Sequence, residues 1–126
     1  GHVYVAPGGK HLTVEKRTSG MHTVLSDEAP VKFCKAAVDV MLDSIIEAYG
    51  DGILTVILTG MGDDGADSCE RLVNHSDKNI LIAQDELTSV VWGMPGAVAT
   101  RGLCHAVESI SNIAPAINKV LSGQKP

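Results

Sequence analysis

Apolar and polar residues alternate along the first part of the chain. This spacing of two occurs over residues 2–6, 11–17 and 21–25, and a Thr-Ser-Gly turn separates the second run from the third. Such alternation is typical of strands that bury one face. We therefore expect a short antiparallel β-meander near the N-terminus.

After these runs, apolar residues recur at the three- and four-residue intervals of an amphipathic helix. They predict a long helix that stops at Gly50, because a glycine commonly ends a helix. The same spacing predicts a helix that begins near Gly65 and a terminal helix that stops at Gly123. Pro95 suits the first position of a further short helix over residues 96–100.

Two continuous apolar runs, 53–59 and 80–83, flank the second of these helices. The first run is apolar on both alternating faces, which predicts a central strand of a parallel sheet covered by helices on both sides. Strand, helix and strand then form a βαβ unit with a right-handed crossover. The expected fold class is α/β, with a mostly parallel, Rossmann-like sheet flanked by helices and the short antiparallel β-meander near the N-terminus.

The first apolar run leads into the turn GMGDDG at 60–65. Parallel sheets present their functional loops at the carboxyl ends of the strands, and residues 84–86 follow the next strand at the same edge. An aspartate just before a helix commonly caps that helix. The same position suits a carboxylate that orients a histidine, binds a metal or activates water. Both interpretations of Asp64 stay open, and Asp63 is the cap or a solvated neighbour if Asp64 points into a site.

Cysteines and helix-face carboxylates have ordinary structural explanations. The cysteines are odd in number and widely spaced, which disfavours a disulfide framework or a CxxC metal site. We expect all three to be reduced, small core residues; they are Cys34, Cys69 and Cys104. Asp43 and Glu47 are expected on the solvated face of the long helix, whereas the role of Asp39 stays open.

Composition narrows the classes of function. The 126 residues are 44% hydrophobic and 20% charged, which is enough for one domain with a genuine core. Ten Lys and Arg residues against 15 Asp and Glu residues give a net charge of −5, and no basic cluster predicts a nucleic-acid partner. No apolar run approaches the roughly 20 residues that span a bilayer, and no signal pattern opens the chain, so a cytoplasmic protein without membrane insertion is expected. No zinc spacing joins the histidines, and no cofactor is expected.

Five segments in order resemble consecutive motifs of the catalytic domain of CheB-type chemotaxis receptor methylesterases. They are GHVYVAPGGKH at 1–11, AVDVML at 37–42, VILTGMGDDGAD at 56–67, IAQDE at 82–86 and SVVWGMP at 89–95. The resemblance covers nearly the whole chain. It implies an α/β esterase that hydrolyses glutamate γ-methyl esters on the cytoplasmic helices of methyl-accepting chemotaxis receptors. In many members of this family the same domain also deamidates receptor glutamines.

The resemblance also implies site residues. The family's triad aspartate falls on Asp64, and the methionine whose backbone N–H helps to form the oxyanion hole falls on Met61. In the family the nucleophilic serine, the base histidine and the receiver domain all lie upstream of the first matched motif. We therefore expect residues 1–126 to be a partial domain that is inactive alone and is marginal, aggregation-prone or paired with a second copy. His11 resembles a histidine near the family's active site but outside the triad, and an exposed strand-end position is the alternative.

A noncatalytic binding function is the second hypothesis. The turn from Gly60 to Gly65 offers backbone N–H groups to an anion, or its aspartate pair to Mg²⁺ with the acidic residues of 84–86 nearby. The acidic charge of the turn disfavours phosphate, and the lack of a third convergent ligand disfavours a metal.

Overall fold

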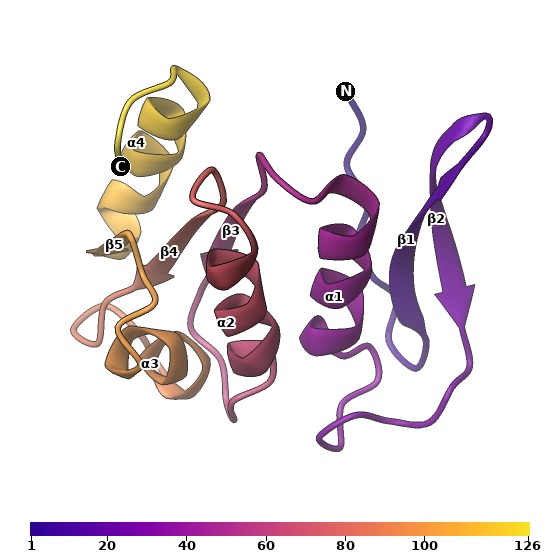
Figure 1. Cartoon of the computed structure of the whole chain (residues 1–126). Helices are drawn as coiled ribbons and strands as arrows, with labels where there is room; N and C mark the ends of the chain where they lie inside the picture. The colour runs from indigo at the N-terminus through magenta and orange to yellow at the C-terminus, as the bar shows by residue number, and fades with distance from the viewer.

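The computed structural model describes residues 1–126, and Figure 1 shows a hairpin, a helix and a helix-covered sheet arranged side by side. The antiparallel hairpin consists of β1 (His11–Arg17) and β2 (Gly20–Ser26). The helix α1 (Val38–Tyr49) packs against β1 on one side and against α2 on the other. The remaining elements are β3 (Leu54–Ile57), α2 (Ala66–His75), β4 (Ile80–Gln84), α3 (Gly93–Thr100), β5 (Ala106–Glu108) and α4 (Ile110–Leu121).

The N-terminal part of the chain is a two-stranded hairpin and not the expected meander. β1 and β2 pair from His11 opposite Ser26 to Arg17 opposite Gly20, so the predicted turn between them is confirmed. Residues 2–6 form no strand and are exposed, so the predicted strand there is wrong. Alternation reports a side-chain pattern, but a strand also needs a neighbour for its backbone hydrogen bonds, and no described strand pairs with this segment.

The second sheet is parallel and has the strand order β3-β4-β5, which confirms the α/β class. β3 lies at the edge of this sheet, whereas the sequence predicted a central strand. The central strand is β4, whose residues from Leu81 to Gln84 are all buried. β5 was not predicted, because three residues are too few to display a period.

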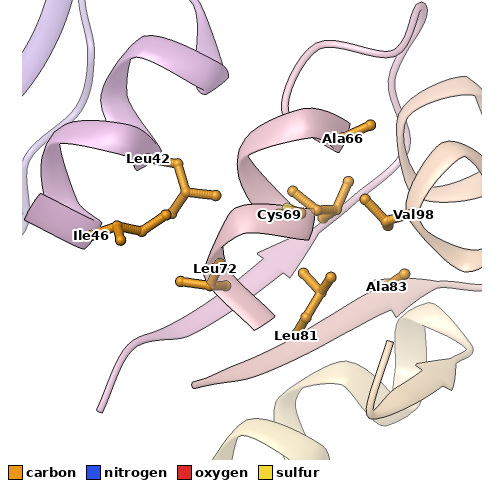
Figure 2. Close-up of a cluster of buried hydrophobic side chains, with 9 residues drawn as sticks. Leu42, Ile46, Ala66, Cys69, Leu72, Leu81, Ala83 and Val98 are labelled. Carbon is orange, nitrogen blue, oxygen red and sulfur yellow. The ribbon is translucent and has the colours of Figure 1, made fainter. Parts of the chain in front are cut away.

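Helices cover both faces of the parallel sheet, as expected. Figure 2 shows the larger core cluster, to which α1, α2, β4 and α3 all contribute. Its buried members are Leu42, Ile46, Ile57, Ala66, Cys69, Leu72, Leu81, Ala83 and Val98. On the opposite face, α4 packs Ile113 and Ala116 against Ile82. The sheet edge and the start of α2 are thereby held in fixed positions.

Helix ends agree with the sequence in one case and differ in another. Gly50 ends α1 with φ 75°, and its N–H donates to the carbonyl of Ile46 at 2.8 Å, as the stop signal predicted. α3 begins at Gly93, so Pro95 is its third residue and not its first. The proline still fits because N–H groups in the first turn have no partner within the helix. None of the helices is both long enough and apolar enough to cross a membrane.

Candidate functional site

The turn that follows β3 is bonded to the segment 91–94, which leads into α3. The N–H of Gly60 donates to the carbonyl of Val91 at 2.9 Å, and the carbonyl of Gly60 accepts the N–H of Met94 at 2.9 Å. Gln84 extends the connection, because its Oε1 accepts the N–H of Thr59 at 2.9 Å. The prediction that the carboxyl ends of β3 and β4 meet at one sheet edge is confirmed, and the Gln84 side chain links them there.

Gly93 lets this turn approach the start of α3 closely. A Cβ at Gly93 would lie 2.9 Å from the carbonyl oxygen of Gly62 and 3.0 Å from both the carbonyl oxygen of Gly60 and the N of Gly62. Those atoms belong to the backbone on either side of Met61. The Met61 side chain is 83% exposed, and its N–H donates to no group of the protein. The turn therefore presents one free backbone donor at the carboxyl end of β3.

Asp64 is buried, with 7% exposure, and its carboxylate binds the first turn of α1. Oδ2 accepts the N–H of Val38 at 2.6 Å, and Oδ1 accepts the N–H of Asp39 at 3.0 Å. Of the two interpretations left open, capping therefore describes a contact that exists, but it serves α1 and not the helix that follows in sequence. α2 has Gly65 as its N-cap, with φ 96° and no side-chain cap. Asp63 is the exposed neighbour.

Asp39 is as buried as Asp64, with 5% exposure, and has its own set of partners. Its Oδ1 accepts the N–H of Ser68 at 3.0 Å and the Ser68 hydroxyl at 2.7 Å. Its Oδ2 lies 3.1 Å from Nζ of Lys32, which also lies 2.9 Å from Oδ2 of Asp67. Burial alone would raise the pKa of Asp39, but the two Ser68 donors and the Lys32 ammonium together hold it below 3.8.

Asp39, Lys32 and Ser68 were not predicted as site residues. The sequence did hold a signal for an acceptor from outside α1: the helix starts after two alanines, which cannot cap its N–H groups. That acceptor is Asp64, and no such signal marked Asp39. The prediction that Asp43 and Glu47 lie on the solvated face of this helix is confirmed. Asp43 is partly exposed and forms two hydrogen bonds with the exposed Arg71, both of 2.8 Å.

A two-residue turn places Cys34 near the carboxylate of Asp64. Val31 and Cys34 exchange backbone hydrogen bonds of 3.0 and 2.8 Å across this turn, and both residues between them, Lys32 and Phe33, have positive φ. Burial and the negative charge of Asp64 raise the pKa of the Cys34 thiol. All three cysteines are free, but Cys34 is partly exposed at the site and so is not the core residue that the sequence predicted.

His11 is 1% exposed, so the alternative of an exposed strand-end histidine is wrong. Its Nδ1 accepts the N–H of Ala37 at 3.1 Å, which leaves Nε2 protonated and donating to the carbonyl of Ala29 at 3.0 Å. Both ring nitrogens are thus used to hold the segment before α1. His11 is a structural neighbour of the site and has no free nitrogen for proton transfer.

Serine and histidine side chains elsewhere make no bond to Asp64. The Ser68 hydroxyl is completely buried and donates to Asp39. One Ser-His contact exists, between Ser19 and His22 at 2.7 Å, but it lies at the exposed end of the hairpin. Among residues 1–126, Asp64 is therefore an oriented carboxylate without a hydrogen-bonded imidazole.

The geometry gives little support to the metal site of the second hypothesis. Both oxygens of Asp64 already face N–H groups, and Oδ1 of Asp85 accepts from the N–H and hydroxyl of Thr88. No group of three or more His, Cys, Asp or Glu side chains comes together as metal ligands. Asp64 and Asp85 are therefore directed at protein donors and not at one shared point.

Comparison with known proteins places this geometry in a family. The sequence profile of the CheB methylesterase family matches residues 1–117. The chain is 52% identical over 121 residues to the "protein-glutamate methylesterase/protein-glutamine glutaminase of group 2 operon" of Rhodospirillum centenum. That match covers 95% of the chain and 30% of the relative. A relative of the same name from Rhodopseudomonas palustris is 46% identical over 125 residues, covering 99% of the chain and 32% of the relative.

A solved structure gives the same result. The crystal structure of the Thermotoga maritima CheB methylesterase catalytic domain superposes with a TM-score of 0.81 at 33% sequence identity. The superposition covers 87% of this chain and 57% of that one. The chain thus spans about 30% of the length of the curated relatives that it matches. The profile match over residues 1–117 and the identities of about half both lead to one conclusion: the chain belongs to the CheB methylesterase family.

Proposed function

We propose that residues 1–126 are part of the catalytic domain of a protein-glutamate methylesterase, and that Asp64 is the acid of its Ser-His-Asp triad. The observation that carries the proposal is the buried Asp64 carboxylate, which two backbone N–H groups at the start of α1 hold in place. The turn that carries Asp64 also leaves the Met61 N–H without a protein acceptor. The names of the relatives supply the reaction, which is hydrolysis of glutamate methyl esters and of glutamine side-chain amides.

The orientation of Asp64 fits the role of a triad acid. A carboxylate can accept about four hydrogen bonds, and only two are used here, one on each oxygen. A second lone pair on one oxygen remains for the Nδ1–H of an imidazole. The carboxylate would hold that ring in the tautomer that accepts a proton at Nε2, and its charge would stabilise the imidazolium that forms.

The reaction would then proceed in two halves. The serine oxygen attacks the ester carbonyl while the imidazole takes the hydroxyl proton, and the negative charge develops on the carbonyl oxygen. The Met61 N–H would donate to this oxyanion, an interaction that contributes about 3 kcal/mol in comparable sites. The proton then moves to the departing methoxide, which leaves as methanol. Water attacks the acyl-serine by the same route and releases the glutamate; with a glutamine substrate, ammonia leaves instead.

The serine and the histidine in this scheme come from a part of the catalytic domain outside residues 1–126. This proposal is supported by the lack of any imidazole bonded to Asp64 and by the 57% coverage of the Thermotoga maritima domain. The edge of β3 that faces away from β4 is unpaired, and we propose that it pairs with that other part, or with a second copy of the chain in its absence. A receiver domain of the same protein is the further partner that the family resemblance implies.

The proposed substrate also determines where the enzyme acts. Methylated glutamates of chemotaxis receptors lie on the cytoplasmic helices of those receptors, so we place the enzyme in the cytoplasm with these helices as its protein partner.

The test compares the 126-residue chain with a chimera in which the chain replaces the matching segment of the Rhodospirillum centenum relative. Release of methanol from a methyl-esterified receptor fragment is expected from the chimera and not from the short chain. In the chimera, Asp64→Asn should lower kcat by about 10⁴, as in comparable triads, because the imidazole takes the wrong tautomer. Asp63→Asn is the matched control and should leave kcat within about twofold. Equal effects of the two substitutions would refute the assignment of Asp64.

A further inference from the structure

The helices α1 and α2 begin next to each other in space, and neither is capped by the residue that precedes it. Ala37 before α1 and Gly65 before α2 make no side-chain cap bond. The first N–H groups of a helix have no partner inside it, so acceptors must come from elsewhere. Here each helix is capped by a carboxylate from the start of the other. Asp64, which lies just before α2, accepts N–H groups of α1. Asp39, in the first turn of α1, accepts the N–H of Ser68 in the first turn of α2.

This reciprocal capping depends on close contact between the two helix starts. A Cβ at Gly65 would lie 2.8 Å from Cγ1 of Val38, so a side chain there would push α1 away. The positive ends of both helix dipoles face the two carboxylates. Lys32 adds a third positive group, at 3.1 Å from Asp39. These groups compensate two negative charges that are both buried.

Asp39 takes part in both capping interactions, through its backbone N–H and through its side chain. Its backbone N–H holds Oδ1 of Asp64, while its side chain anchors the same turn of α1 to Ser68. We infer that Asp39 is a positioning residue for the triad carboxylate, because its side chain keeps the start of α1 where two N–H groups orient Asp64. The inference rests on the proposed function of Asp64 as the triad acid. A shift of about 1 Å in such a constellation can lower the rate about 10²-fold.

The test uses the same chimera and measures kcat and KM separately. Asp39→Ala should lower kcat by about 10- to 100-fold and leave KM within about twofold, because the Asp39 side chain is buried against Ser68 and Lys32. Asp39→Asn keeps an oxygen for the Ser68 donors, so it should retain most of the rate. Leu42→Ala is the matched structural control: it removes core packing in the same helix and should leave kcat unchanged at temperatures where the variant is folded.

A readout apart from activity follows the capping bond itself. In the NMR spectrum of the 126-residue chain, Asp39→Ala should move the amide proton of Val38 upfield, because its bond to the Asp64 carboxylate weakens. Asp43→Ala, one turn further along α1, should not. If Asp39→Ala fails to fold, Ser68→Ala replaces it; this variant loses the hydroxyl donor to Asp39 and should lower kcat a fewfold with KM unchanged.

The outcomes separate the two proposals. Full activity of Asp64→Asn would refute the proposed function. Loss of activity in Asp64→Asn, together with equal kcat in Asp39→Ala and Leu42→Ala and an unmoved Val38 amide proton, would overturn the positioning role alone. Unchanged kcat in Ser68→Ala would overturn it equally if Asp39→Ala does not fold.

Discussion

Asp64 should contribute to the stability of the chain even without a substrate or an upstream segment. Its two oxygens accept N–H groups from Val38 and Asp39 at 2.6 and 3.0 Å in a site with 7% exposure. Asp64→Asn keeps one acceptor and directs an amide N–H₂ group at the other N–H. One hydrogen bond to a charged group contributes about 1.5–3 kcal/mol, and loss of a helix cap costs about 0.5–2 kcal/mol. We therefore expect a loss of about 2 kcal/mol.

Urea unfolding at pH 7, followed by the fluorescence of Trp92 and by circular dichroism, measures this loss. With a denaturant slope of about 1.5 kcal/mol/M, a loss of 2 kcal/mol lowers the midpoint by about 1.3 M. Asp63→Asn is the matched control, because Asp63 is exposed and adjacent in sequence, and should change the stability by no more than about 0.5 kcal/mol. A midpoint for Asp64→Asn that coincides with that of Asp63→Asn would refute the assigned capping bonds.

Three further predictions follow from other contacts of the site. Gly93→Ala should lower the kcat of the chimera at least tenfold, because the new Cβ would meet backbone atoms of the turn 60–62 at 2.9–3.0 Å; Ala99→Gly on the same helix is the control. The stability that the Asp39 carboxylate contributes should be present above pH 3.8, the pKa of the unfolded group, and should be lost as the pH falls through the lower folded pKa. Asp39→Asn should lack this pH-dependent loss in acid unfolding, and an acid-unfolding profile equal to that of the unsubstituted chain would contradict the prediction. Alkylation of Cys34 at pH 8 should be slow and should accelerate in Asp64→Asn, because the carboxylate charge helps to raise the thiol pKa. Mass spectrometry of the labelled peptide measures the rate, and an unaltered rate would argue against this electrostatic effect.

Much of the architecture followed from local patterns. The helix that ends at Gly50 and the apolar runs that became β3 and β4 are marked by spacing and stop signals that act within a few residues. Motif order along the chain also indicated the family before any contact was known. Local chemistry of this kind is written in the sequence because each signal and its effect lie close together along the chain.

The sequence alone determined the α/β class, the presence of the four helices and of the strands β3 and β4, and the placement of two carboxylates at a strand end. Only the tertiary structure decided that Asp64 caps α1 and not α2, that Asp39 and Ser68 return the contact, and that β3 lies at a sheet edge. The physical reason is that a backbone N–H group can donate to any correctly placed acceptor. Which carboxylate reaches it depends on how residues that are 25 or 26 positions apart in sequence meet in space.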